Sequence, residues 1–195
     1  MQNLNDKNIE FSFAFEVSEK QIEVASASDP DLLKIRCFGT HEGLNENGLL
    51  VLRQVLKDNY RSLIDKPVVV VLDKDNKPTG HGYDFKRKKF IEAKRKYVGH
   101  VVDAFPCIVC EDGSIVDVSW TDEVDYPKGE FRILCDLVIY KRYLGELSET
   151  LSDLHVGGEL KFSIEAVTDQ EVTYEGIRNC TKIQFTGLAI VKNPA

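Results

Sequence analysis

The chain has 195 residues, of which 43% are hydrophobic and 29% charged, and its net charge is -7. This composition suits a globular domain with a real core, and the acidic balance argues against nucleic acid as the main partner, because phosphate binding needs a basic surface. No apolar run approaches the ~20 residues that cross a bilayer, and the polar start shows no secretory signal. We therefore expect a single cytoplasmic domain over residues 1–195, without a membrane partner and with its five cysteines kept as thiols.

Alternating apolar and polar residues, or short β-branched runs, predict much of the chain as strand. The first alternation lies at residues 11–15, so residues 1–31 are interpreted as an N-terminal extension or an edge strand. The other predicted strands are 32–38, 68–72, 97–109, 131–139, 159–168 and 181–192.

Two stretches have the apolar spacing of helices. The first is 49–63, with Asn45 or Asn47 as a candidate cap. The second is 141–156, which the glycine pair at 157–158 should end.

The segments 39–48 and 73–96 are predicted as loops. The second is strongly basic between 86 and 96, but Glu92 interrupts the run and the rest of the chain is acidic, so we interpret it as a solvated loop. Because the elements do not follow a βαβα order, we expect an α+β fold with an antiparallel-rich sheet or barrel.

Ser163 lies in a predicted strand whose two faces differ in chemistry. Phe162 and Ile164 belong to an apolar face, whereas Lys161, Ser163 and Glu165 lie on the other one. The pattern predicts an accessible Ser163 hydroxyl, as in a nucleophile, but a surface serine on a half-exposed strand has the same pattern.

A serine nucleophile needs a base, and histidine is the usual one because its pKa lies near the operating pH. Of the four histidines, His81 stands between two glycines that let its ring project from a loop edge, and Asp84 is near enough to orient it. His41 lies in a predicted loop, His100 is expected to pack within its strand, and His155 is expected to cap a helix C-terminus.

The chain also contains a CxxC motif, Cys107 to Cys110, inside a predicted strand. There the two thiols would point to opposite faces, and no second CxxC accompanies them, so metal binding and redox chemistry are disfavoured. No P-loop, dinucleotide-binding or HExxH motif occurs either. We expect neither a cofactor nor a metal.

Two segments near the end read GGELKFSIEA, at 157–166, and FTGLAIVKNPA, at 185–195. They resemble the nucleophile strand and the closing strand of the phage prohead maturation proteases, serine peptidases of the herpesvirus assemblin type. Residues 63–67, 79–81 and 97–101 resemble, in the family's order, the entry to its histidine region, the histidine segment and the strand that follows.

This resemblance implies an assemblin-like β-barrel flanked by helices, with Ser163 as nucleophile and His81 as general base on its outer face. Relatives often place a histidine or an acid on the closing strand, and the corresponding position here is Gly187. Glu165 is therefore our first candidate for the third catalytic residue. Asp84, His100 and a water molecule remain alternatives.

The resemblance further implies a serine endopeptidase that cleaves the scaffold and the major capsid protein inside the assembling prohead, in the host cytoplasm. It leaves self-association into a homo-oligomer open. Because Gly187 cannot orient an imidazole, the alternative is a catalytically inactive capsid-assembly or scaffold module on the same fold.

Overall fold

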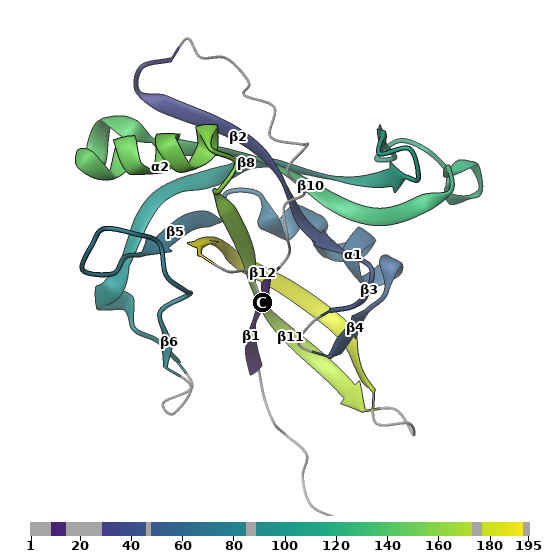
Figure 1. Ribbon diagram of the computed structural model, residues 1–195. Coiled ribbons are helices and arrows are strands. Elements are labelled where there is room, and N and C mark those ends of the chain that lie inside the picture. Colours follow the sequence, from purple (N-terminus) through teal and green to yellow (C-terminus); the bar gives the residue numbers. More distant parts are fainter. Residues whose placement is uncertain (1–8, 15–28, 46–47, 85–88, 173–176, 193–195) are drawn as a thin grey trace, which may run out of the picture.

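The computed structural model describes residues 9–14, 29–45, 48–84, 89–172 and 177–192, and of 9–14, 83–84 and 89–90 only the backbone. These residues form one sheet of ten strands and a separate two-stranded ribbon (Figure 1). The strands are β1 (Ile9–Ala14), β2 (Leu32–His41), β3 (Gly43–Leu44), β4 (Leu49–Val51), β5 (Pro67–Val71), β6 (Tyr83–Asp84), β7 (Lys89–Phe90), β8 (Arg95–Cys110), β9 (Ile115–Asp117), β10 (Gly129–Tyr140), β11 (Lys161–Val172) and β12 (Arg178–Val191). The α-helices are α1 (Arg53–Asn59) and α2 (Glu146–Val156), and the 3-10 turns are η1 (Tyr60–Leu63), η2 (Glu92–Lys94), η3 (Glu123–Asp125) and η4 (Lys141–Tyr143).

The main sheet runs in the order β1-β11-β12-β5-β8-β10-β2, with β4 added to β12, β3 to β4 and β9 to β8. Most of its ladders are antiparallel, but β12 runs parallel to both β4 and β5. The sheet is therefore mixed, and the antiparallel-rich sheet predicted from the sequence holds only in part.

The sheet curls until strands from its two sides meet across the core. A Cβ at Gly39 of β2 would lie 2.8 Å from the Cys135 sulfur and 3.2 Å from the Ile164 side chain of β11. No ladder joins β2 to β1 or β11 among the described residues, so this contact is made by side chains alone. The result is a curled half-barrel, so the expectation of a barrel holds only in part.

Both α-helices bury apolar side chains in the core enclosed by the sheet. Leu56 of α1 and Leu63 of η1 are fully buried there, and α2 contributes Leu147 and Leu151. The helix predicted over 141–156 is confirmed from Glu146 on, whereas its first three residues form η4. It ends just before Gly158, whose φ of +70° favours glycine.

The first predicted helix is wrong in its N-terminal part. Residues Leu49–Val51 form β4 instead, in register with residues 178–180 of β12, and the helix begins only at Arg53. Asn45 caps no helix, because its side chain accepts a hydrogen bond from the Leu49 N–H within a turn. The alternative cap, Asn47, lies outside the described residues.

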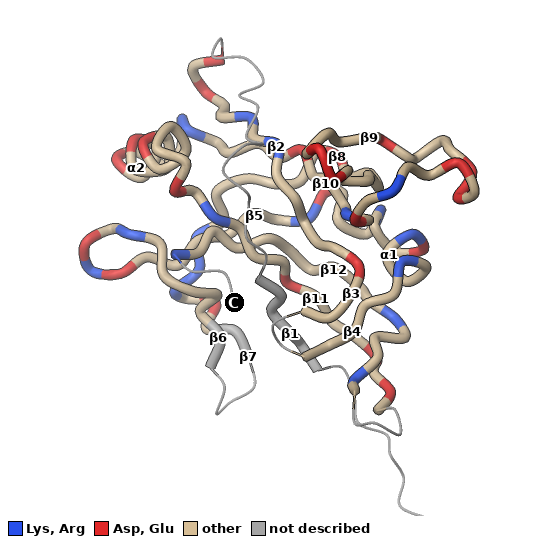
Figure 2. Tube along the Cα trace, turned by 45° about the vertical axis from the view of Figure 1, so that its right-hand side comes forward, with Lys and Arg blue, Asp and Glu red and all other residues tan. Residues whose placement is uncertain are grey.

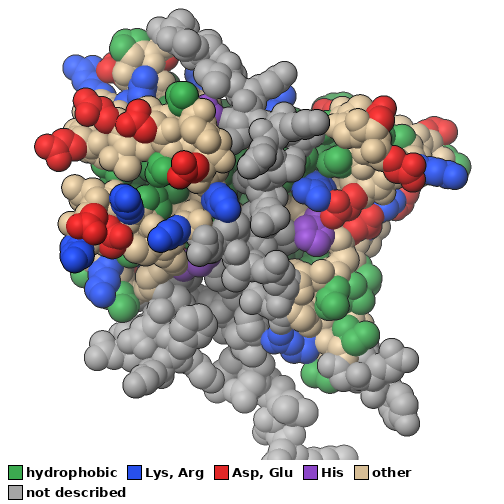
Figure 3. Space-filling model, in the orientation of Figure 1, with side chains coloured by type: hydrophobic (Ala, Val, Ile, Leu, Met, Phe, Trp, Pro, Cys, Tyr) green, Lys and Arg blue, Asp and Glu red, His purple; other side chains and the backbone are tan. Residues whose placement is uncertain are grey.

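Charges of both signs are spread along the chain, and α2 carries acidic residues without a lysine or arginine (Figure 2). Acidic and basic side chains are also mixed on the face drawn in Figure 3, where the described part shows no continuous basic area. None of the described helices is long and apolar enough to span a membrane.

Candidate active site

Ser163 lies in the first half of β11, a strand held between β1 and β12. Its Cα partners are Ala189 in β12 and Ala14 in β1. Its neighbours Phe162 and Ile164 point into the core, as the alternation predicted. The exposure of the other face was predicted wrongly, since Ser163 is only 1% exposed.

Buried apolar residues and a returning loop lie beside Ser163. Val69, Ala189 and Val191 form a buried cluster beside the serine, on strands β5 and β12. The chain after β5 folds back over this face and is fixed by backbone bonds from Thr79 N–H to Val71 O and from Lys192 N–H to Thr79 O, each of 2.8 Å. Periodicity alone shows that two faces differ and does not show what covers each of them.

The returning loop brings His81 between Ser163 and Glu165. His81 Nε2 lies 2.9 Å from Ser163 Oγ, and Nδ1 lies 3.1 Å from Glu165 Oε1. With the ring proton on Nδ1, the imidazole donates to the carboxylate and accepts from the serine hydroxyl. The adjacent Gly82 has a φ of +69°, and a Cβ there would lie 2.9 Å from a Val71 methyl group, so glycine allows the loop to approach β5 closely.

The second carboxylate oxygen of Glu165 is taken by Arg95 at the start of β8. The Arg95 guanidinium donates to Glu165 Oε2 at 2.5 Å, and the two side chains are 5% and 2% exposed. A buried carboxylate is costly unless it is paired, and this ion pair supplies the partner. The ion pair with Arg95 and the contact with His81 together hold the Glu165 carboxylate, because each of its oxygens has a partner.

Arg95 is the residue of this group that the sequence analysis missed. It belongs to the basic stretch interpreted as a solvated loop, and residues 85–88 of that stretch lie outside the described residues. No signal in the sequence singled out Arg95, because the strand pattern placed Glu165 on an accessible face, where it would need no cation.

Gly187 stands directly opposite Glu165 in the β11–β12 ladder. A Cβ at position 187 would lie 3.0 Å from the Pro67 carbonyl oxygen and 3.3 Å from Glu165 Oε2. A side chain at position 187 would therefore have to share space with the Glu165 carboxylate and the backbone at Pro67.

The other candidate residues lie away from Ser163 or have side chains outside the described part of the chain. His100 receives or donates a hydrogen bond with the Tyr140 hydroxyl and packs against its ring, as a strand residue was expected to do. His155 is buried in the last turn of α2, where burial lowers its pKa, so it is not a charged C-terminal cap. The side chain of Asp84 lies outside the described residues.

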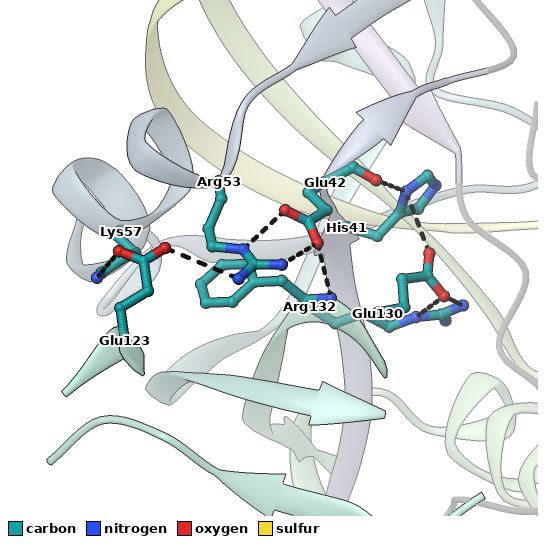
Figure 4. A network of polar contacts seen from close by, with 8 residues as sticks. His41, Glu42, Arg53, Lys57, Glu123, Glu130 and Arg132 are labelled. Carbon is teal, nitrogen blue, oxygen red and sulfur yellow. Dashed lines mark hydrogen bonds and ion pairs between the residues drawn. The ribbon is translucent and has the colours of Figure 1, made fainter. Parts of the chain in front are cut away.

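His41 belongs to a separate polar network that joins the end of β2 to α1 and β10 (Figure 4). Its Nδ1 lies 2.6 Å from the Glu42 carbonyl oxygen and 3.4 Å from Glu130 Oε1. The Glu42 carboxylate accepts two hydrogen bonds from Arg53, which also reaches Glu123. The pairing ties the end of β2 to α1, which indicates a structural network.

The CxxC thiols lie on opposite faces of β8, as predicted. Cys107 packs with Phe38 and Leu134 on the outer face, where burial raises its pKa to about 12, while Cys110 packs against the main core. A raised pKa keeps a thiol protonated and unreactive.

A cavity with a volume of about 810 Å³ lies away from this site. Its walls include Arg61, Phe105 and Trp120 but none of Ser163, His81 and Glu165.

The chain matches a family model and solved structures. The family model of the YonD N-terminal domain matches residues 31–195. Among solved structures, the bacteriophage T4 capsid assembly protease, gp21, matches with a TM-score of 0.48 at 12% sequence identity, covering 96% of this chain and 97% of that chain. Comparison with curated proteins gave no match.

Proposed function

The chain belongs to the YonD N-terminal domain family over residues 31–195, and from the geometry of its buried polar site we propose that it is a serine endopeptidase. The observation that carries the proposal is the continuous chain of contacts from Ser163 through His81 to Glu165, at 2.9 and 3.1 Å. Such a chain is what an activated serine needs: a base within hydrogen-bond reach and a third group that orients the base.

In the proposed reaction, Ser163 Oγ attacks the carbonyl carbon of a peptide bond and gives its proton to His81 Nε2. His81 passes this proton to the departing amine, which leaves an ester between the acyl group and Ser163. A water molecule then attacks the ester, His81 takes a proton from the water, and that proton returns to Ser163 Oγ as the carboxylic product leaves. Glu165 holds the Nδ1–H tautomer throughout and stabilises the imidazolium.

The proposed substrates are the scaffold and capsid proteins of an assembling prohead. This part of the proposal depends on the sequence resemblance of residues 157–166 and 185–195 to the prohead proteases. The alternative of an inactive assembly module was motivated by Gly187, and the position of Glu165 beside His81 weakens that motive.

The test is labelling with a fluorophosphonate, which reacts only with activated serines. We expect the parent chain to gain one adduct by intact mass, and Ser163→Ala and His81→Ala to gain none. The control Ser114→Ala removes a serine hydroxyl from an exposed turn and should label like the parent. Equal labelling of Ser163→Ala and the parent would exclude Ser163 as the nucleophile, and a parent that never labels would favour the inactive module.

A further inference from the structure

The N-terminal strand β1 occupies the sheet edge next to the proposed nucleophile (Figure 1). It pairs with β11 in antiparallel register from Ile9 opposite Thr168 to Ala14 opposite Ser163. The other edge of β11 is filled by β12 along its whole length. If β1 left, β11 would become an edge strand with Ser163 on it.

This strand lies outside the region that defines the family. The family model begins at residue 31, so the matched domain includes β11 and β12 but not β1. β1 is therefore an addition in cis to a sheet edge, and an unpaired edge readily accepts an extended peptide.

Ser163 is buried, and with β1 in place the β11 edge beside it is occupied as well. Ser163 is 1% exposed and the side chain of His81 is 14% exposed, whereas a scissile carbonyl must come within ~3 Å of the attacking oxygen. Some segment has to move before a chain can reach Ser163, and β1 is the strand beside it that the family domain does not contain.

We propose that the edge of β11 is the docking site for an extended polypeptide substrate, and that β1 is a displaceable occupant of this edge that holds the protein in a closed form. This inference rests on the proposed peptidase function. A substrate would replace β1 in the same antiparallel register and would pair with β11 between Ser163 and Thr168. The peptidase would then become active when β1 is removed or when a substrate displaces it from the edge.

The first experiment weakens β1 without shortening the chain. In an antiparallel pair alternate residues donate to the neighbouring strand, and proline cannot donate, so Ser12→Pro with Phe13→Pro removes a ladder bond whichever of the two donates. We expect the rate of fluorophosphonate labelling to rise by about tenfold or more. The matched control, Gln2→Pro with Asn3→Pro, places the same two prolines ahead of β1 and should label like the parent.

A second experiment locks β1 in place. Glu10 and Val167 are register partners, so Glu10→Cys with Val167→Cys places two cysteines at a separation that a disulfide can span. We expect oxidation to slow labelling and a reductant to restore it, with no such change in Glu10→Cys alone. A folded proline variant that labels no faster than the parent, or an oxidised variant at full rate, would overturn the proposal.

A third measurement separates this inference from the serine chemistry. A fluorescent peptide with the sequence of residues 8–15 is titrated into Ser163→Ala, with and without the Ser12→Pro and Phe13→Pro pair. If only the variant that also carries the two prolines binds the peptide, the displacement of β1 is supported. This holds even if no form of the protein reacts with the fluorophosphonate, and in that case only the peptidase proposal fails. Equal binding, or binding to neither, would overturn the displacement.

Discussion

Glu165 is buried, yet each of its carboxylate oxygens has a partner. Oε1 contacts His81 and Oε2 contacts Arg95. The imidazole therefore meets a carboxylate whose position is fixed from the other side, which is the arrangement that selects one histidine tautomer. Arg95 does not touch the serine, so we regard it as a positioning residue.

We predict that Glu165→Gln lowers kcat/KM for peptide cleavage by about 10²- to 10⁴-fold, because the amide no longer stabilises the imidazolium or fixes its tautomer. The measurement is the rate of cleavage, or of fluorophosphonate labelling where no substrate is known. The control is Glu171→Gln, which makes the same change at an exposed position of the same strand. Parent-like rates in Glu165→Gln would remove this residue from the site.

We predict that Arg95→Met lowers the free energy of unfolding by about 3–5 kcal/mol, because it leaves a buried carboxylate without its cation. Urea unfolding followed by circular dichroism measures this. Lys94→Met changes an exposed neighbour in the same way and should stay within about 0.5 kcal/mol of the parent. If the unpaired Glu165 carboxylate causes the loss, the double variant Arg95→Met with Glu165→Leu should have a higher free energy of unfolding than Arg95→Met alone. It should still be inactive.

Among the elements, β8 and β10 are packed without room for a side chain at Gly99. A Cβ there would lie 1.8 Å from the Val138 carbonyl oxygen, a distance that no side chain tolerates without moving the backbone. This contact fixes the part of β8 that follows Arg95, so it also helps to position the ion pair with Glu165.

We predict that Gly99→Ala lowers the free energy of unfolding by about 3 kcal/mol, at the upper end of overpacking effects. Thermal unfolding provides the measurement. Gly80→Ala is the matched control, because a Cβ at position 80 meets nothing within 4 Å. Equal melting temperatures for the two variants would show that the strands separate here at little cost.

The sequence predicts strands well where local pattern and tertiary role agree, as for the runs that became β5 and β11. It fails where pairing with a segment far away in the chain determines the secondary structure. Leu49 and Leu52 fit a helical spacing, but residues 49–51 pair with β12, which is ~130 positions away in the chain. The same holds for the site: the pattern singled out Ser163 and Glu165, whereas their burial and the role of Arg95 depend on a loop and a strand that periodicity does not place.

At the scale of the whole molecule, stability should fall in mild acid because of His155. Burial lowers the pKa of this histidine, and neither ring nitrogen has a hydrogen-bond partner among the described residues. The neutral form is favoured in the folded protein. The contribution of His155 is therefore fully present above the unfolded pKa of about 6.5 and is lost as the pH falls toward the lower folded value.

We predict that the free energy of unfolding of the parent is lower at pH 5.5 than at pH 7.5, and that His155→Phe reduces this difference. Phenylalanine fills a similar volume and cannot take a proton. Urea unfolding of the parent and of His155→Phe at the two pH values measures the four free energies of unfolding that this comparison needs. An unchanged difference in His155→Phe would assign the acid sensitivity to other groups.

The opposition of Glu165 and Gly187 has a consequence for how relatives of this chain should vary. The two positions face each other across one ladder, and a Cβ at 187 would lie 3.3 Å from Glu165 Oε2. Only one of them can carry a large side chain, so the two positions should covary: a histidine or an acid at 187 should accompany a small residue at 165, and a glutamate at 165 should accompany glycine at 187. If Glu165 has the role proposed for it, a comparison that inspects position 187 alone would wrongly count such chains as inactive.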